Sequence, residues 1–395
     1  MIKRFFSNTI VVLLLAVVVG ILAGFFIPEA GMKGVLVVKQ LCGQVIFFLV
    51  PLIIIAFVAP SIAALKGNVS RLILFAFALA YLSSVGAALF GMSVGYQFIP
   101  LLGIEPVEEP LRELPVTLFN LEIPPVMSVM SALLLSVFIG LGSIWIQSKE
   151  ITGLLNAFRD LVLQLVNRIL IPVLPVYVAA NFCMLSYEGN ISRLVVFLPV
   201  ILVVILCHYV WLAFLYLLAA LYSKKNSWQV LKYYGPAYMT ALGTMSSAAT
   251  LGVALECIEK SPVVDKKVSD FTIPLFANIH LCGSVLTEVF FVCVVSQLLY
   301  GQLPELSTLL LFIVLLGVFA VGAPGVPGGT VLASLGIVVS VLGFDDAGTA
   351  MLIAIFALQD SFGTACNITG DGALTLIVNA FENRNHSAGQ SKETT

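Results

Sequence analysis

Long apolar stretches separated by short polar segments dominate this sequence. A membrane-spanning helix needs about 20 predominantly apolar residues, because each residue rises about 1.5 Å through a hydrocarbon layer about 30 Å thick. The pattern therefore predicts an all-α polytopic membrane protein with eight transmembrane helices. The predicted spans are residues 9–27, 36–64, 71–102, 125–147, 153–185, 193–222, 268–300 and 346–380.

Two further apolar stretches carry turn-forming residues near their centres. Residues 227–258 contain a small, polar run at 245–250, and lysines flank both ends. Because Lys and Arg mark the cytoplasmic side of short loops, both ends are expected on the cytoplasmic face. This stretch is therefore predicted to enter the membrane and turn back as a re-entrant helical hairpin.

The second stretch, residues 305–343, is centred on a segment rich in proline and glycine at 322–329. Two prolines and four glycines cannot continue a helix. The flanks are acidic and lack Lys or Arg, so both ends are expected on the extracytoplasmic face. A hairpin opposed to the first one is predicted. The alternative is a single kinked span, which would place the tail containing Arg384 and Lys392 outside.

Composition supports a membrane location and limits the range of partners. Hydrophobic residues make up 60% of the chain and charged residues 10%, whereas soluble domains carry about 25% charged residues. The formal net charge of -2 gives no reason to expect a nucleic-acid partner. The basic residues fall on one side of the predicted spans. The protein is therefore expected in the inner or plasma membrane, as a multi-pass protein with cytoplasmic N- and C-termini.

Two opposed hairpins indicate transport. Unpaired backbone groups are costly in hydrocarbon, so non-helical segments persist only against protein or beside a water-filled cavity. Broken segments in matching, inverted positions are the best sequence pointer to the binding site of a transporter. The sequence therefore predicts a secondary transporter whose site lies near the middle of the membrane.

The last predicted span carries a polar stripe. Asp360, Thr364, Asn367 and Asp371 are spaced i, i+4, i+7 and i+11, which places them on one helical face about 16 Å long. Charged residues inside spans are rare and usually functional. Two carboxylates there could bind an ammonium group and a bare cation. Hydrogen bonding between helices is the structural alternative, and it suits the aspartates poorly.

The preceding span carries a second polar set. His280, Ser284 and Glu288 are spaced i, i+4 and i+8, which predicts a shared helical face. Glu288 is a candidate proton carrier, because burial penalises the charged form of a carboxyl group. Its alternative is a neutral, hydrogen-bonded acid. His280 suits a functional role and a packing role equally well.

These features together resemble the sodium/dicarboxylate symporter family, the family of glutamate transporter homologues. The resemblance covers essentially the whole chain. Its strongest matches are Asn367-Ile368-Thr369-Gly370-Asp371 in the last span and Gly325-Val326-Pro327-Gly328 in the outer hairpin. Ser246-Ser247 with Thr250 is a weaker match to the serine-rich tip of the inner hairpin.

The resemblance implies a trimeric elevator fold. Residues 1–70 and 103–190 would form a scaffold, residues 71–102 and 191–382 a moving transport domain, and residues 383–395 a cytoplasmic tail. Asp360 would hold the substrate amino group, Asn367 the α-carboxylate and Asp371 a sodium ion. The other implied substrate-binding residues are Gly363, Thr364, Ser246, Ser247, Thr250, Val326, Pro327 and Gly328. The other implied cation-binding residues are Asn367, Asn278, His280, Cys282, Ser83 and Ser84.

Three positions depart from the family pattern or vary within it. Gly363 stands where members that transport acidic substrates carry Arg, so a neutral amino acid is favoured over glutamate or aspartate. Cys282 stands where the family has a sodium-binding Asp, and a neutral thiol is a poor ligand for a hard cation. Glu288 stands where proton-coupled members carry a glutamate, which supports its interpretation as a proton carrier.

The sequence therefore predicts symport of an amino acid coupled to Na+ and/or H+, with no organic cofactor. The predicted partners are a small amino acid or dicarboxylate, the lipid bilayer and two further copies of the chain. The alternatives are a proton-coupled carrier of a dicarboxylate without an amine and a channel-like anion conductance. An enzyme is disfavoured, since Asp360 and Asp371 lie about 16 Å apart and cannot share a proton.

Overall fold

The computed structural model describes residues 9–63, 71–103, 114–115, 123–188, 197–323 and 328–393. Within these ranges every regular element is a helix, which confirms the predicted all-α class. Within the described ranges, six helical stretches are long and apolar enough to cross a membrane. They are Glu29–Pro60, Arg71–Leu102, Lys149–Met184, Pro199–Ser223, Lys266–Tyr300 and Asp346–Arg384. The predicted spans at 9–27 and 125–147 are shorter apolar helices.

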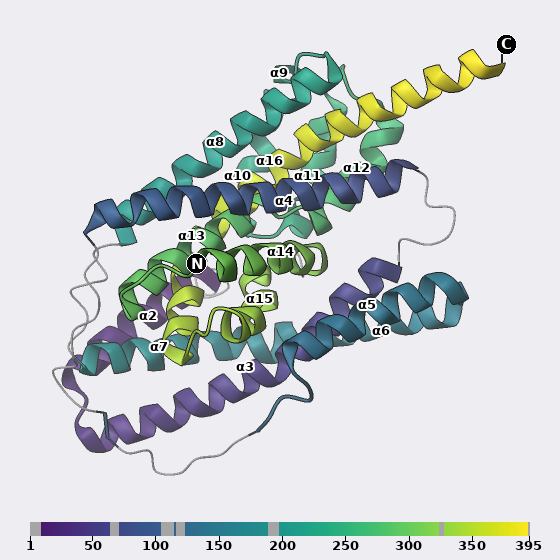
Figure 1. Ribbon diagram of the computed structural model, residues 1–395. Coiled ribbons are helices and arrows are strands. Elements are labelled where there is room, and N and C mark those ends of the chain that lie inside the picture. Colours follow the sequence, from purple (N-terminus) through teal and green to yellow (C-terminus); the bar gives the residue numbers. More distant parts are fainter. Residues whose placement is uncertain are drawn as a thin grey trace.

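The first group of helices lies along the lower side of Figure 1. It consists of α2 (Thr9–Phe26), α3 (Glu29–Ala63), α5 (Val129–Ile146), α6 (Lys149–Leu165) and α7 (Ile171–Tyr187), which pack on one another. Glycines bring α2 and α7 close together. A Cβ atom on Gly20 would lie 2.4 Å from the carbonyl oxygen of Ala179. A π-helical turn, Val166–Leu170, joins α6 to α7.

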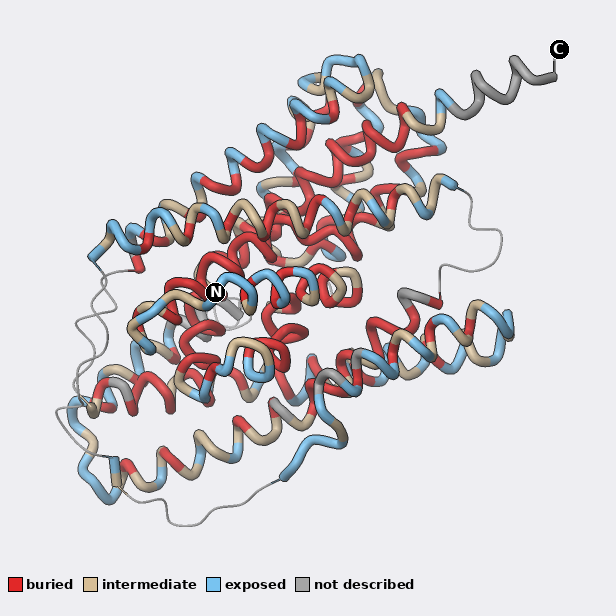
Figure 2. The backbone as a smooth tube through the Cα atoms, in the orientation of Figure 1, coloured by how far each residue is buried: buried red, intermediate tan, exposed pale blue. Residues whose placement is uncertain are grey.

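The second group forms the upper side of the molecule in Figure 1, and its central helices are the most deeply buried in Figure 2. It comprises α4 (Arg71–Phe98), α8 (Phe197–Ser223), α12 (Lys266–Ile279), α13 (Cys282–Tyr300) and α16 (Asp346–Glu393). α13 packs against both α4 and α16, and α16 packs against α8. α16 continues without a break through most of the range predicted as a tail.

The first predicted hairpin is present as two helices, α10 (Gly235–Thr244) and α11 (Ser247–Glu259), preceded by the short α9 (Trp228–Leu231). The chain reverses at Met245, which has a left-handed backbone conformation with φ of 50°. Ser246 then begins α11, because its side chain accepts a hydrogen bond from the backbone N–H of Ala249.

The second predicted hairpin comprises α14 (Leu306–Gly322) and α15 (Gly329–Ser340). α15 begins after Gly328, whose φ of 72° suits a residue without a side chain. Val326 and Pro327, both predicted at the substrate site, lie outside the described residues. The hairpin lies between the two groups of helices, because α14 packs against α4 of the second group and both arms contact α3 of the first.

One predicted span is wrong in its continuity. Residues 268–300 were expected to form one helix, but the chain is extended at His280 and irregular at Leu281, between α12 and α13. His280 therefore does not share a helical face with Ser284 and Glu288. Pro274 lies within α12 before the break, but the hydrophobic pattern itself gives no sign of a break at His280. The break is stabilised by side chains of α16, which bind residues 280–284.

Candidate functional site

The break between α12 and α13 faces the polar stripe of α16, and Asn367 makes the central contact. Its Oδ1 accepts hydrogen bonds from the backbone N–H groups of Gly283, at 2.7 Å, and Ser284, at 3.2 Å. Its Nδ2 donates to the hydroxyl of Ser284 at 2.9 Å. The first N–H groups of a helix have no partner within the helix, so Asn367 stabilises the start of α13 from a neighbouring helix.

Two glycines allow α13 and α16 to approach closely at this point. A Cβ atom on Gly283 would lie 2.5 Å from the carbonyl oxygen of Gly363 and 2.5 Å from the Cβ of Cys366. That position therefore requires glycine. A Cβ atom on Gly363 would lie 3.4 Å from the nearest atoms of Ser284, which is ordinary van der Waals contact. Gly363 thus leaves room for a Cβ atom beside the break.

Asp360, one step further along the stripe, contacts the outer hairpin. Its Oδ2 accepts a hydrogen bond from the backbone N–H of Gly328 at 2.6 Å, and the hydroxyl of Thr364 binds the same carboxyl group. The side chain is buried. Gly328 precedes the first turn of α15, where the partial positive charge of a helix N-terminus favours a carboxylate. Asp360 therefore connects α16 to the end of the hairpin.

Asp371 lies at the other end of the stripe and contacts the broken segment. Its Oδ1 is 2.8 Å from Nδ1 of His280, and Nε2 of His280 is 2.9 Å from the hydroxyl of Ser83 on α4. Asp371 and His280 are each 0% exposed. The imidazole ring thus joins α4 to α16 through the break, and this contact needs the non-helical backbone that the sequence pattern did not predict.

Glu288, the predicted proton carrier, is buried on α13 and contacts the hydroxyl of Ser334 on α15. Its second carboxyl oxygen, Oε2, has no hydrogen-bond partner among the described residues. Glu288 therefore contacts α15 at Ser334, whereas Asp360 binds Gly328 before that helix, and the environment of Glu288 depends on the position of α15.

The inner hairpin is stabilised largely by bonds within itself. The hydroxyl of Thr250 donates to the backbone carbonyl of Ser246 at 2.9 Å, and it lies 3.2 Å from the hydroxyl of Thr244. Ser247 and Thr250 are buried. Helices α10 and α11 both pack against α16. The predicted residues Ser246, Ser247 and Thr250 therefore belong to a hairpin that packs against the helix carrying the stripe.

The remaining predicted cation-binding residues differ in their surroundings. Ser83 contacts His280, whereas the hydroxyl of Ser84 is buried without a hydrogen-bond partner among the described residues. The thiol of Cys282 is buried against His280 and Cys366. Asn278 is exposed, and its Nδ2 donates to the carbonyl oxygen of Pro274 in its own helix at 2.8 Å. Asn278 therefore does not join the group around Asp371 in this conformation.

Two aromatic or heteroaromatic residues near the site were not predicted. His208 on α8 is buried, and its Nε2 lies 2.8 Å from the hydroxyl of Thr287 and 3.1 Å from the carbonyl oxygen of Gly283. The phenol of Tyr216 donates to the carbonyl oxygen of Thr369 at 2.9 Å. His208 is a polar residue inside the predicted apolar span 193–222, and that position could have marked it as a candidate.

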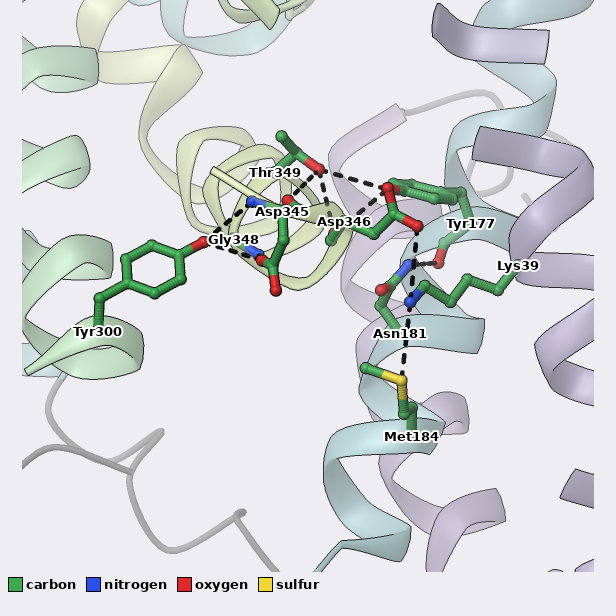
Figure 3. A network of polar contacts seen from close by, with 9 residues as sticks. All are labelled: Lys39, Tyr177, Asn181, Met184, Tyr300, Asp345, Asp346, Gly348 and Thr349. Carbon is green, nitrogen blue, oxygen red and sulfur yellow. Dashed lines mark hydrogen bonds and ion pairs between the residues drawn. The ribbon is translucent and has the colours of Figure 1, made fainter. Parts of the chain in front are cut away.

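A second polar network joins the start of α16 to the first group of helices (Figure 3). Nζ of Lys39 on α3 lies 3.7 Å from Oδ2 of Asp346. The phenol of Tyr177 on α7 lies 3.2 Å from the carbonyl oxygen of Asp346 and 3.3 Å from the hydroxyl of Thr349. Tyr300, at the end of α13, donates to Oδ1 of Asp345 at 2.8 Å. The network therefore connects both groups of helices.

Similar proteins place the chain in a family. The sequence profile of the Sodium:dicarboxylate symporter family matches residues 10–381. Excitatory amino acid transporter 1 of Homo sapiens is 31% identical over 167 residues, which cover 41% of this chain and 30% of that protein. Excitatory amino acid transporter 3 of Bos taurus is 29% identical over 245 residues, covering 60% and 45%. An excitatory amino acid transporter of Caenorhabditis elegans is 29% identical over 161 residues, covering 40% and 31%.

Each match covers less than half of the relative's length. The family profile, in contrast, extends over nearly the whole of this chain, and it confirms the resemblance seen in the motifs of the outer hairpin and the last helix. The chain therefore belongs to the sodium:dicarboxylate symporter family.

Proposed function

We propose that this protein is a secondary active transporter that couples the uptake of a neutral amino acid to Na+ and/or H+. Family membership supports cation-coupled symport of amino acids or dicarboxylates. The observation that carries the choice of an amino acid is the position of Asp360. Asp360 is 5% exposed, and its carboxyl group accepts a hydrogen bond from the backbone N–H of Gly328.

A buried carboxylate needs a compensating partner, and the ammonium group of an amino acid supplies one. One backbone N–H group and one hydroxyl bind Asp360 in this conformation, and neither carries a full positive charge. A substrate amine binding here would add that charge beside the end of the outer hairpin. Binding of the substrate would then favour closure of the hairpin over the site. A dicarboxylate without an amine would instead meet a like charge.

A neutral side chain is favoured because the site offers no guanidinium at residue 363. Arg binds a carboxylate through two parallel hydrogen bonds, and glycine provides neither charge nor donor. Gly363 lies beside Ser284 and close to Asn367, whose amide binds the start of α13. Nδ2 of Asn367 has a second N–H besides the one that Ser284 accepts, and it lies at the start of α13, where the helix dipole favours an anion such as a substrate α-carboxylate.

The two groups of helices support an elevator mechanism. The scaffold would contain α2, α3, α5, α6 and α7, and the transport part would contain α4, α8 and α10 to α16. This division applies the predicted boundaries at residues 71–102, 103–190 and 191–382 to these helices. The network of Figure 3 would then be a contact between scaffold and transport part that must break during the cycle. A homotrimer in the inner or plasma membrane, with both termini cytoplasmic, completes the proposal.

Glu288 is the proposed proton carrier. It is fully buried and contacts Ser334 of the outer hairpin. A charge on this carboxyl group would be poorly solvated unless the hairpin moved or water entered. Binding and release of a proton would therefore be linked to the position of α15, which also contacts the substrate site through Gly328.

Uptake into proteoliposomes tests the function. Radiolabelled serine and alanine should accumulate when inward gradients of Na+ and H+ are imposed, and accumulation should stop when both gradients are removed. Asp360→Ala should abolish accumulation, whereas Asp270→Asn, which changes an exposed aspartate on α12, should not. Accumulation without any gradient would contradict symport. Uptake that succinate blocks and serine does not would contradict an amino-acid substrate.

A further inference from the structure

The immediate surroundings of Asp371 are unusual for a sodium-binding carboxylate. Oδ1 is 2.8 Å from Nδ1 of His280, and both side chains are 0% exposed. A carboxylate buried this deeply requires a donor or a cation beside it. The imidazole N–H meets that requirement at Oδ1 without any bound ion.

The contacts on the other side of the imidazole fix its orientation. The hydroxyl of Ser83 lies 2.9 Å from Nε2, and a serine hydroxyl can donate to an unprotonated ring nitrogen. That arrangement places a ring proton on Nδ1, directed at Asp371. The ring also packs on Gly370, where an added Cβ atom would lie 3.0 Å from Cε1 of His280. The ring is therefore held in position by both α4 and α16.

The donor atoms around Oδ1 do not suit sodium. Hard cations prefer carboxylate, carbonyl and water oxygens, whereas imidazole and thiol groups suit softer metals. On the broken segment, the imidazole of His280 contacts Asp371, and the thiol of Cys282 lies beside His280 and Cys366. The amide of Asn278, which could supply an oxygen, is exposed and binds Pro274 of its own helix.

We propose that the imidazole of His280 replaces a sodium ion at Asp371, so that this carboxylate contributes no sodium site. The proposal rests on the proposed function, because it specifies which ions that transporter can couple to. Coupling would then depend on the remaining sodium positions and on Glu288. The second oxygen of Asp371, Oδ2, has no hydrogen-bond partner among the described residues and is the one place where sodium could still approach the carboxylate.

Sodium alone is the probe for this proposal. The thermal midpoint of the purified full-length protein is measured in NaCl and in choline chloride at equal ionic strength. Four proteins are compared: the unmodified chain, Asp371→Asn, His280→Asn and the double variant. Because bound sodium stabilises the folded state in proportion to ln(1 + [Na+]/Kd), a new site gives a midpoint shift of roughly 1–3 °C at about ten times Kd.

The unmodified chain and Asp371→Asn should show the same sodium-dependent shift. His280→Asn should show a larger shift, because an amide oxygen and a cation-sized space then replace the ring. The double variant should lose that gain. A smaller shift in Asp371→Asn than in the unmodified chain would overturn the proposal, because it would place sodium on Oδ2 or Oδ1 of Asp371. The absence of any gain in folded His280→Asn would overturn it equally.

His280→Gln is the second variant if His280→Asn does not fold, and it carries the same expected gain. If Asp371→Asn does not fold, the gain in a folded His280 variant decides the question alone. The measurement needs no transported substrate. A failure of amino-acid uptake would therefore contradict the proposed function and leave the sodium result standing. A sodium result that overturns the present proposal would likewise leave the proposed amino-acid transport standing.

Discussion

The carboxyl group of Asp360 holds the backbone N–H of Gly328 at 2.6 Å, across the boundary between α16 and the outer hairpin. These residues are 32 positions apart in the sequence, and their contact fixes where α15 begins relative to the polar stripe. A carboxylate bound to an N–H group forms a charge-assisted hydrogen bond, which contributes more than a neutral one. In the proposed function, Asp360 therefore has two roles: it binds the substrate amine, and it holds the end of the hairpin.

Replacing Asp360 by Asn should loosen the hairpin even without substrate. Hydrogen bonds to charged groups contribute about 1.5–3 kcal/mol, so amide hydrogen exchange over residues 328–332 should become roughly tenfold or more faster. Exchange mass spectrometry measures this directly. Asp270→Asn is the matched control, because that aspartate is exposed on α12. Unchanged exchange in Asp360→Asn would show that other contacts hold the hairpin end.

Gly363→Arg should change substrate preference from neutral toward acidic amino acids. A Cβ atom at residue 363 makes only ordinary contact with Ser284, so the backbone can accept a side chain there. A guanidinium group adds a bidentate partner for a substrate carboxylate, and a charged, well-placed pair changes discrimination by about 1–3 kcal/mol, or roughly tenfold to a hundredfold. Competition of aspartate against serine in proteoliposome uptake measures the ratio.

Gly363→Ala is the control for that experiment, because it adds the Cβ atom without the charge. It should leave the ratio of aspartate to serine competition within about twofold of the unmodified chain. An equal shift in the Ala and Arg variants would assign the change in preference to the shape of the pocket and would contradict the role given to the missing guanidinium.

Gly283→Ala should destabilise the protein. The added methyl group would lie 2.5 Å from the backbone oxygen of Gly363, which belongs to a neighbouring helix and cannot move independently. Overpacking of a tight core costs about 1–3 kcal/mol, so the thermal midpoint should fall by several degrees. Gly252→Ala provides the control on α11, where an added Cβ atom meets nothing within 4 Å. A midpoint equal to that of Gly252→Ala would show that α13 and α16 can separate without loss.

The sequence predicts the helices far better than it predicts the breaks between them. Apolar stretches of about 20 residues identify most long helices, because the hydrocarbon layer sets their length. The two hairpins are also predictable, since Ser246 and Gly328 carry turn and capping signals. The break at His280 is not, because it depends on Asn367, 84 residues from Gly283, supplying the hydrogen bond that would otherwise come from the helix.

The candidate site shows the same limit. Helical spacing alone places Asp360, Asn367 and Asp371 on one face, and the structure gives each of them a partner from another segment. Spacing cannot say which partner each residue meets. It also placed His280 on the face of Glu288, whereas the non-helical backbone directs the imidazole to Asp371. Partners that come from different helices depend on tertiary packing, which a one-dimensional pattern does not contain.

The polar network in Figure 3 contains a buried hydrogen bond and a more exposed ion pair, and their contributions to stability can be measured separately. Tyr177 is fully buried, and its phenol lies 3.3 Å from the hydroxyl of Thr349 on the first turn of α16. Tyr177→Phe should remove about 0.5–1.5 kcal/mol, and amide exchange over residues 346–350 should become roughly twofold to tenfold faster. Lys39→Met should change exchange less, because the side chain of Asp346 is 51% exposed and exposed ion pairs contribute little.

Tyr177→Phe and Lys39→Met also test whether this network affects the rate of transport. If α16 must leave α7 during each cycle, then Tyr177→Phe should alter the initial rate of amino-acid uptake at saturating substrate while Lys39→Met leaves it close to that of the unmodified chain. Tyr209→Phe is the matched control, since Tyr209 lies on α8 and its phenol contacts Tyr238 on α10 of the inner hairpin. Equal uptake rates in Tyr177→Phe and Tyr209→Phe, together with faster exchange in Tyr177→Phe alone, would mean that this contact stabilises the start of α16 without limiting its movement.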